Sequence, residues 1–543
     1  MASSTQEPPP APLLHSLLST AISLIASYWP ILLTLTVILR ALYKRYASPL
    51  RTIPGPFLAS ITRLHKFFST LSEHTNYDHI ALHQTYGPLV RIAPNEISSS
   101  SPKMAREILA AGRRFYKTDF YGVFPPPENP DIFTETREDV HAVKKKVANV
   151  CYSMTAMSRL TPFIDDTIDV LVDKMSGFCS SSENQGKPLI PFDLGNWLHY
   201  FAFDVLGEVA FSRPFGFLSL GADVEGAIAT IDASQKYNGV VGQIPELDFL
   251  LRRNPLWKLV PSLGLDPGMN LITRIALEEM GKRRPFEKGA WSEGAGEVKG
   301  VGGGDEREDL LAGLIRGHLK DPEKFGEGDI FAVAHGAIFA GSDSTASSMQ
   351  SLFYLVLSSP QTYTRLSQEI SSAVLTGSLP ATGNISWQQA QSLSYFQACL
   401  KEAMRLRPAV GLNITRLVPG PDGVEIEGRR VAAGTRVAVN AWVLHRDKEV
   451  FGDDADVFRP ERWLGDEERA RVMERYMFHF GGGSHVCIGR NLALLEINKV
   501  VPRLLRDFEF RLVHPGRELK AKATFFVVQE GLEVYLSRRS PAA

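Results

Sequence analysis

The stretch FGGGSHVCIGRNLALLE, residues 480–496, places three glycines, a histidine and a single cysteine directly before a helical pattern. Apolar residues recur at helical spacing after Gly489, which predicts that a helix begins there. The unpaired N–H groups and partial positive charge of a helix N-terminus favour the thiolate form of a nearby cysteine. Glycines lack side chains, so the backbone can approach a large, flat ligand. If such a flat ligand carries a metal ion, Cys487 is the candidate residue to bind that metal.

The composition argues against nucleic acid as a partner. Lys and Arg number 59 against 60 Asp and Glu in 543 residues, so no net positive field attracts a phosphate backbone. The length alone suggests about three domains, although large single enzymes break that rule. Small molecules and membranes remain as the expected partners.

The cysteines indicate a reducing compartment. They are far apart in the chain and show none of the paired spacing of disulfide frameworks or zinc sites: Cys151, Cys179, Cys399 and Cys487. Two sequons, at Asn384 and Asn413, would carry glycan only on the lumenal side of a membrane. The cysteine usage argues against that location.

The N-terminal region predicts one membrane-spanning helix. Residues 11–39 contain no charged side chain, and the apolar core at about residues 17–39 is long enough to cross a bilayer. A cleaved signal peptide is the alternative, but such peptides are shorter and carry their positive charge before the apolar core. Here the basic residues follow it: Arg40, Lys44, Arg45 and Arg51. Positive-inside bias then leaves the rest of the chain in the cytoplasm.

The domain organisation follows from that boundary. Residues 1–52 are expected to form the membrane anchor and a basic linker, and residues 53–543 the globular body as one domain. Ile53-Pro-Gly-Pro56 predicts a stiff turn between them, because proline fixes φ. Helical patterns dominate the body, with short strand-like runs at 89–92 and 436–439. The glycine-rich segment 289–306 is interpreted as a surface loop.

The cysteine segment matches a known signature. Phe480, Gly483, His485, Cys487 and Gly489 reproduce the pattern F-x-x-G-x-[R/H]-x-C-x-G, and the chain therefore resembles microsomal, fungal-type members of the cytochrome P-450 superfamily. A buried cysteine in a glycine-rich turn would be the favoured interpretation of any one of these residues alone. The resemblance implies one α-rich domain with small β-sheets, the cytochrome P-450 fold, preceded by the N-terminal transmembrane helix.

The resemblance also implies a cofactor, heme b, with Cys487 as the axial ligand of its iron. Phe480 would pack beside the sulfur. His485 takes the place that most members fill with arginine, and its ring would donate a hydrogen bond to a heme propionate. Histidine is a weaker point charge there, because it titrates near neutral pH whereas arginine does not.

A second pair of motifs resembles the family's structural charge cluster. Glu402-Ala-Met-Arg405 matches E-x-x-R, and Arg462 follows the proline and glutamate of the P-E-R-F/W segment. The tetrapeptide alone fits an exposed ion pair on a helix surface. By resemblance, Glu402, Arg405 and Arg462 form a buried triad whose role is structural, since removal of one partner leaves the other charges unpaired.

The third motif, residues 340–345 (AGSDST), lies in a long helical run from about 327 to 359. It resembles the A-G-x-[D/E]-T-[T/S] segment that binds oxygen in the family. A helix-packing face of small residues is the alternative. The resemblance implies that Asp343 gathers protons and that Ser344, where the family usually has threonine, relays them. Thr345 could share the role, so these three are the predicted catalytic residues.

Further contacts with the propionates are implied by position. His141 and Lys145 resemble a [W/H]-x-x-x-[R/K] pair, for which an ordinary basic helix face is the alternative. Arg416 sits where the family places another propionate-binding arginine. Residues 410–412 and the aromatic segment 120–124 are expected to line the substrate pocket.

The function that these features predict is a heme-dependent monooxygenase, which inserts one oxygen atom of O₂ into an apolar or amphipathic small molecule, with a role in fungal secondary metabolism. The segment after Cys487 resembles no flavin-binding module, so electrons are expected from a separate NADPH-cytochrome reductase. The expected location is the endoplasmic reticulum membrane, single-pass, with the catalytic domain on its cytoplasmic face. Two alternatives remain: a heme-thiolate isomerase or dehydratase that needs no O₂, and a non-catalytic heme-binding sensor.

Overall fold

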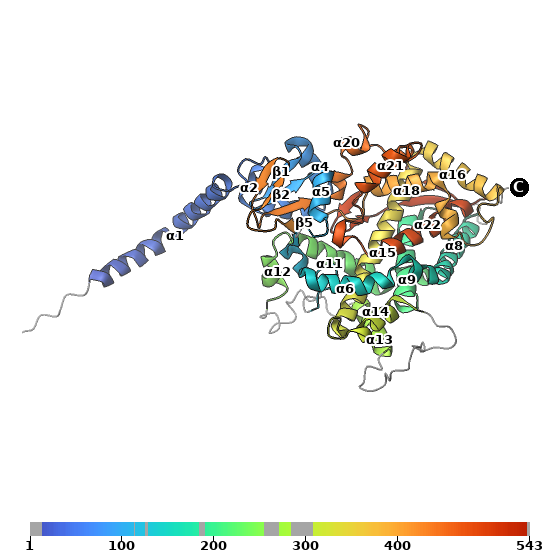
Figure 1. Cartoon of the computed structure of the whole chain (residues 1–543), viewed down its shortest axis with the longest axis horizontal. Helices are drawn as coiled ribbons and strands as arrows, with labels where there is room; N and C mark the ends of the chain where they lie inside the picture. The colour runs from blue at the N-terminus through green and yellow to red at the C-terminus, as the bar shows by residue number, and fades with distance from the viewer. Residues whose placement is uncertain are drawn as a thin grey trace, which may run out of the picture.

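A long helix, α15 (Glu327–Leu357), runs through the middle of the body (Figure 1). Its neighbours are α9 (Leu194–Phe211), α18 (Ser394–Leu406) and α22 (Arg490–Asp507), and all four helices contribute to one apolar core. The computed structural model describes residues 13–112, 115–124, 129–183, 190–254, 271–283 and 308–539. The body is mainly helical with small sheets, as predicted. The loop expected at residues 289–306 lies outside the described residues.

The ends of α15 follow from its sequence. The Asp329 carboxylate accepts a hydrogen bond from the backbone N–H of Gly326 (2.8 Å), which caps the first turn. Pro360 opens the next helix, α16 (Pro360–Leu375), so α15 stops just before it. Inside α15, a Cβ added at Gly341 would lie 3.2 Å from Leu206 of α9. The glycine therefore lets these two helices pack closely.

The largest sheet has five strands in the order β1-β2-β8-β5-β3. Only β2 and β8 pair in parallel within it. The strands predicted at 89–92 and 436–439 are confirmed. Strand bounds in this sheet are Leu89–Ala93 (β1), Glu96–Ser99 (β2), Tyr116–Lys117 (β3), Ile414–Leu417 (β5) and Arg436–Val439 (β8).

Three smaller sheets complete the described strands. They pair β4 (Phe192–Asp193), β12 (Glu533–Arg538) and β9 (Phe508–Leu512), then β10 (Ala521–Ala523) with β11 (Val527–Gln529), and β6 (Val424–Ile426) with β7 (Arg429–Val431).

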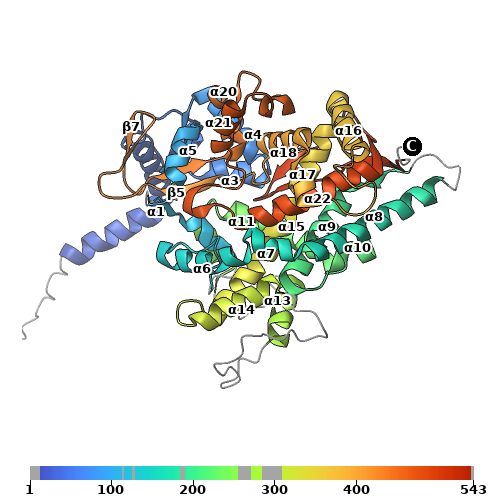
Figure 2. The ribbon, with the colours of Figure 1, turned by 45° about the vertical axis from the view of Figure 1, so that its right-hand side comes forward.

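Other helices surround this framework (Figure 2). Their bounds are Phe57–Ile61 (α2), Leu64–Leu71 (α3), Thr75–Tyr86 (α4), Pro102–Leu109 (α5), Glu138–Cys151 (α6), Met154–Arg159 (α7), Thr161–Glu183 (α8), Phe217–Leu220 (α10), Ala227–Val241 (α11), Glu246–Leu251 (α12), Leu271–Lys282 (α13), Leu310–Lys320 (α14), Trp387–Gln391 (α17), Ala441–Leu444 (α19), Lys448–Phe451 (α20) and Glu467–Arg475 (α21). The 3-10 turns used below are η1 (Asp119–Val123), η5 (Pro460–Trp463) and η6 (Gly483–His485).

The N-terminal helix α1 (Leu13–Tyr46) extends away from the body (Figure 1). Among the residues that the structure describes, no helix combines the length and the hydropathy that crossing a membrane requires. Several side chains of the span expected at 17–39 lie outside the described part, and the span is not confirmed. The turn after it is fastened to the body, because the Arg91 N–H donates to the Pro54 carbonyl (2.7 Å).

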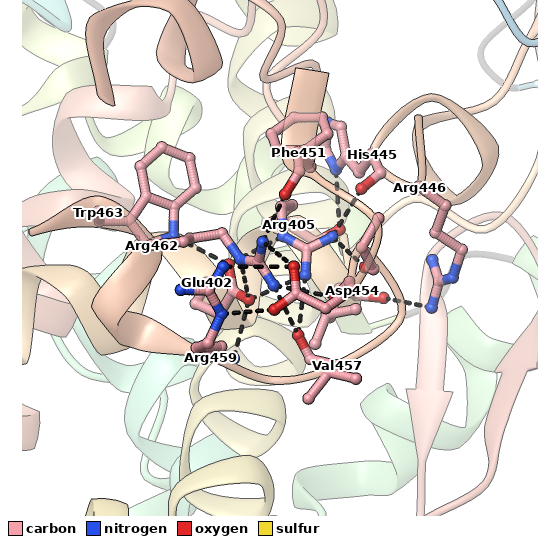
Figure 3. A network of polar contacts seen from close by, with 12 residues as sticks. Glu402, Arg405, His445, Arg446, Phe451, Asp454, Val457, Arg459, Arg462 and Trp463 are labelled. Carbon is pink, nitrogen blue, oxygen red and sulfur yellow. Dashed lines mark hydrogen bonds and ion pairs between the residues drawn. The ribbon is translucent and has the colours of Figure 1, made fainter. Parts of the chain in front are cut away.

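The predicted charge triad is present and buried (Figure 3). Arg405 donates two hydrogen bonds to Glu402, each 2.8 Å, and Arg462 Nε donates a third at 2.8 Å. None of the three side chains is more than 1% exposed. Burial by itself raises the pKa of Glu402, but the hydrogen bonds of Arg405 and the charges of both arginines hold it below its usual value. The triad joins α18 to η5.

His445 connects this triad to the cysteine segment. Arg405 Nη1 donates to the His445 carbonyl (2.7 Å), and His445 Nδ1 lies 2.9 Å from the Arg405 carbonyl (Figure 3). The backbone N–H of Phe478 donates to His445 Nε2 (2.7 Å). Since Nε2 accepts, Nδ1 carries the proton and the ring is neutral. Burial, with the neighbouring His479, lowers the pKa of His445 well below its usual value.

Candidate functional site

The cysteine segment forms a closed loop in front of α22. The backbone N–H of Cys487 donates to the Phe480 carbonyl (2.8 Å), and Gly481 and Gly483 adopt left-handed φ angles of 73° and 59°. A Cβ on Gly483 would lie 1.7 Å from the Leu109 carbonyl oxygen of α5. The glycines were expected to make room for a flat ligand. At Gly483 the close neighbour is instead the end of α5, a contact that the sequence pattern did not show.

Cys487 faces a cavity of about 330 Å³. The opposite wall comes from α15, where Ala340, Gly341, Ser344 and Thr345 line the cavity. The structure therefore brings the cysteine signature and the 340–345 motif to two sides of one space. Ser342 and Asp343 do not line it, and the Asp343 side chain is bonded to His199 of α9 and Gln235 of α11.

Opposing influences act on Cys487. Burial raises the pKa of its thiol, whereas the Gly489 and Arg490 N–H groups and the Lys145 charge lower it. The helix N-terminus thus acts in the predicted direction. Metal coordination deprotonates a cysteine outright, so a bound metal would stabilise the thiolate further.

Basic side chains gather along one side of the same cavity. Those that line it are Lys117, His141, Lys145, Arg416 and His485. Burial first, and then the charges of its basic neighbours, lowers the pKa of His141 to about 3, of His485 to about 2 and of Lys117 to about 7. Basic groups that lower one another's pKa in this way are stabilised in their charged forms by an anion placed among them. This side of the cavity therefore suits a ligand with carboxylate groups.

The predicted propionate contacts occupy different positions in this group. Arg416 Nη1 donates to Tyr121 Oη and to the Thr415 carbonyl (2.9 Å), while its Nε is buried without a partner among the described residues. The His141 and His485 rings lie 4.4 Å apart, and His485 Nδ1 also has no partner in the described part. The Arg416 Nε–H is available to an anion, and His485 Nδ1 becomes a second donor when its ring is protonated.

Lys145 has a different set of contacts. Its ammonium group donates to the Ser484 carbonyl (2.6 Å) and to the Val486 carbonyl (2.7 Å), on the two sides of His485. It braces the loop that carries the cysteine. Phe480 lines the cavity beside this loop, and its ring centroid lies 4.1 Å from that of His479.

Two charged residues of this group escaped sequence reasoning. Lys117 comes from strand β3, and Glu138 Oε2 lies 3.2 Å from His485 Nε2. Glu138, His141 and His485 lie close enough together to be a candidate metal cluster, but they belong to the anion-binding side of the cavity. Burial raises the pKa of Glu138, against the charges of Lys117 and Arg416. Glu138 precedes His141 by three positions, one helical turn, and that spacing was the available signal.

Asp343 is held by two side chains that the sequence did not indicate. His199 Nε2 lies 2.8 Å from its Oδ1, and the Gln235 amide donates to its Oδ2. His199 comes from α9 and Gln235 from α11. Asp343 is therefore paired with a titratable group on a neighbouring helix, and nothing in the AGSDST motif predicts this pair.

The hydroxyl residues of the motif remain at the cavity. Ser344 Oγ donates to the Ala340 carbonyl (2.6 Å), a local bond that competes with the helical ladder. Ser348 Oγ donates in the same way to the Ser344 carbonyl (2.8 Å). Thr345 is buried and also lines the cavity.

Aromatic and aliphatic side chains form the remaining wall. Of the two segments predicted to line a pocket, Tyr121, Phe124, Val410 and Leu412 reach the cavity. Phe120 packs behind them in an aromatic cluster instead. Other apolar members of this wall, which the sequence did not indicate, are Phe133, Phe339, Phe525 and Phe526.

Comparisons with known proteins agree with this arrangement. The family model for cytochrome P-450 matches residues 53–535. A cytochrome P-450 monooxygenase of Aspergillus terreus is 35% identical over 88% of this chain and 93% of its own length. The cytochrome P-450 monooxygenase cicH of Emericella nidulans is 33% identical over 92% and 96%, respectively. Pisatin demethylase of Fusarium vanettenii is 32% identical over 94% and 93%.

The heme that binds in this family has a flat ring, two carboxylate groups and an iron that needs an axial ligand. The cavity has a thiol on one wall, unpartnered buried donors along a basic side, and small residues on the opposite helix. These residues fit that cofactor. The matched signatures, the fold and the relatives together establish that the chain belongs to the cytochrome P-450 family.

Proposed function

We propose that this chain is a heme-thiolate monooxygenase with Cys487 as the axial ligand of the iron and an apolar or amphipathic small molecule as substrate. The observation that carries the proposal is the position of Cys487, which shares one cavity with Ala340, Gly341, Ser344 and Thr345 of α15. The heme would supply binding and activation of O₂ there. His485, Arg416 and His141 would bind its propionates, Lys145 would brace the loop, and Phe480 would pack beside the sulfur.

The chain's own residues would move protons and position the substrate. O₂ activation consumes protons, and Asp343, Ser344 and Thr345 lie next to one another on the helix that faces Cys487. Ser344 and Thr345 line the cavity, so their hydroxyls would pass protons to the oxygen, with Asp343 as the donor behind them. The aromatic wall would orient the substrate and exclude water.

Electrons would come from a separate NADPH-cytochrome reductase, and the relatives support a role in fungal secondary metabolism. Curated relatives are named as monooxygenases and one as a demethylase, in several fungi. Insertion of one oxygen atom of O₂ into a substrate accounts for both kinds of name. The test is an incubation of the protein with reductase and NADPH under ¹⁸O₂. An extract of the cells from which the protein comes supplies the substrate. A product with one ¹⁸O atom is expected, and an unlabelled product would refute the monooxygenase assignment.

The ligand assignment has its own test. The reduced carbon monoxide complex of the protein should show the red-shifted Soret band of thiolate ligation, and Cys487→Ala should abolish it. Cys151→Ala is the matched control, because Cys151 is a free thiol on α6 that does not line the cavity. Persistence of the band in Cys487→Ala would show that another residue binds the iron.

We also propose that α1 anchors the protein to the endoplasmic reticulum membrane with the body on the cytoplasmic face. The support is a set of exposed apolar side chains on α1 together with others on α2, α3 and α12: Tyr28, Trp29, Ile31, Leu32, Leu33, Leu35, Val37, Ile38, Leu39, Phe57, Leu58, Leu64, Phe68, Phe249 and Leu250. Arg63 pairs with Glu246 (2.7 Å), so α12 lies beside α2 and α3. Alkaline carbonate should leave the full chain in the membrane pellet and release a chain that starts at Ile53, and release of both would contradict the proposal.

A further inference from the structure

Asp343, the acid of the 340–345 motif, is bonded to one titratable side chain in the described part of the molecule. His199 Nε2 lies 2.8 Å from Asp343 Oδ1, although the two residues are 144 positions apart in the chain. The other bond, from the Gln235 amide to Oδ2, comes from a group that does not titrate. His199 is therefore the group through which a proton would reach Asp343.

The two side chains of the pair differ in their exposure to solvent. The Asp343 side chain is 5% exposed, whereas that of His199 is 15% exposed. The imidazole thus reaches toward the surface from a carboxylate that does not. A histidine binds and releases protons at neutral pH, and its two ring nitrogens let it take a proton on one side and give one on the other. The pair has the geometry of a step between solvent and the interior.

A second acid lies next to this pair. Asp232 is half-buried on α11, one helical turn before Gln235. Burial, with the charge of Asp343, raises the pKa of Asp232 to about 7, while His199 acts in the opposite direction. Asp232 on α11 and Asp343 on α15 are thus two carboxylates near His199, and the charges of Glu530 and Asp223 also act on Asp232.

The other bonds of this cluster hold it in place. Gln235 accepts from the backbone N–H of Phe526 through Oε1 (3.2 Å) and donates to Asp343 through its amide. The Gln235 side chain is also part of the cavity wall. The His199 ring packs 5.3 Å from that of Phe203. His199 and Asp343 therefore keep one relative position at the edge of the cavity.

We propose that His199 is a positioning residue that delivers protons from solvent to Asp343, and this proposal depends on the proposed function. In each step the neutral imidazole, protonated at Nε2, first takes a proton at Nδ1 from water. The N–H bond at His199 Nε2 then breaks as an O–H bond forms at Asp343 Oδ1, which leaves a neutral ring protonated at Nδ1. The ring returns to its starting form by exchange of protons with water. Asp343 passes its proton to the cavity, where reduction of O₂ consumes it. No electrons move in this relay, so it needs no further co-reactant.

The first test measures how O₂ is reduced by the holoenzyme with reductase and NADPH and without substrate. Reduction of O₂ to hydrogen peroxide takes two electrons and two protons, and reduction to two waters takes four of each. His199→Gln keeps an amide that donates to Asp343 but removes the titratable proton. We expect the rate of water formation to fall by about tenfold, with more of the O₂ released as peroxide. This decrease is smaller than the 10²- to 10⁴-fold effect expected for a residue that transfers the proton directly to the reacting group.

Two control variants separate proton delivery from structure. Gln235→Leu removes the other bond to Asp343 without loss of a titratable group, and it should change the peroxide share by less than half as much as His199→Gln. His514→Gln makes the same substitution at a surface histidine with a 54% exposed side chain, and it should match the wild type. A wild-type peroxide share in His199→Gln, or an equal change in Gln235→Leu, would overturn the inference.

The second test does not depend on turnover. Exchange of the imidazole C2 hydrogen in D₂O, followed by mass spectrometry of peptides, reports on each histidine of the intact holoenzyme. Asp343→Asn should slow exchange at His199 at least twofold, because the negative charge beside the ring is gone, and should leave His514 unchanged. An unchanged rate at His199 would overturn the coupling. Lack of NADPH-dependent O₂ consumption in the wild type would instead overturn the proposed function.

Discussion

Glu402→Gln tests whether the buried triad stabilises the fold through its charges. The glutamine keeps the size of the side chain but removes the negative charge that Arg405 and Arg462 share, and these arginines have side chains no more than 1% exposed. Removal of one partner of a buried ion pair costs about 3–5 kcal/mol, because the remaining charge stays buried. Unfolding entropy of about 2.1 cal/mol/K per residue, over about 480 residues, gives about 1 kcal/mol/K. The expected decrease in Tm is therefore about 3–5 °C.

The assay is thermal unfolding of the holoenzyme followed by circular dichroism. Glu474→Gln is the matched control, because Glu474 pairs with Lys401 at the surface, where the side chains are 45% and 41% exposed. An exposed pair contributes less than about 1 kcal/mol, so the control should lower Tm by about 1 °C or less. Equal Tm values for the two variants would refute the view that the triad is held by its charges.

Three further predictions concern the cysteine loop and the cavity. Gly483→Ala should at least halve the heme bound per chain, measured as pyridine hemochrome, because its methyl group would lie 1.7 Å from the Leu109 carbonyl; Gly465→Ala, also at a positive φ but with open space around it, should bind normally. Lys145→Met loses two hydrogen bonds to the loop and should speed heme transfer to apomyoglobin by about tenfold, as a loss of about 1.4 kcal/mol implies; an unchanged rate would contradict this. Burial lowers the pKa of His335 to about 4, so the unfolded chain takes up one more proton and stability falls as pH drops from 6.5 toward 4. The free energy of unfolding in urea should differ between pH 7.5 and pH 4.5 by about 3 kcal/mol less in His335→Phe than in the wild type. An equal pH difference in the two proteins would refute this prediction.

The elements that the sequence predicted well are those that local patterns determine. The start of α22 at Arg490 follows from the glycine before it and the apolar spacing after it. The end of α15 follows from Pro360. The signature around Cys487 identified the family, which the family model and the relatives confirm. Each of these depends on residues that are neighbours in the chain.

The features that escaped prediction depend on long-range contacts. The need for glycine at 483 comes from the end of α5, and the partner of Asp343 comes from α9. No pattern within either motif contains this information. The electrostatics of Cys487 show the same limit, because a helix N-terminus is visible in the sequence whereas the nearby charge of Lys145 is brought in by the fold. The role of each predicted site residue stays a prediction.

His445 links the cysteine loop to the charge triad. Its ring accepts the Phe478 N–H, two residues before the cysteine loop, only while its other nitrogen is bonded to the carbonyl of Arg405, and Arg405 in turn donates to the His445 carbonyl. A change in the triad that displaces Arg405 would therefore also loosen the start of the loop. Damage to a structural cluster outside the cavity is thus expected to weaken retention of the cofactor.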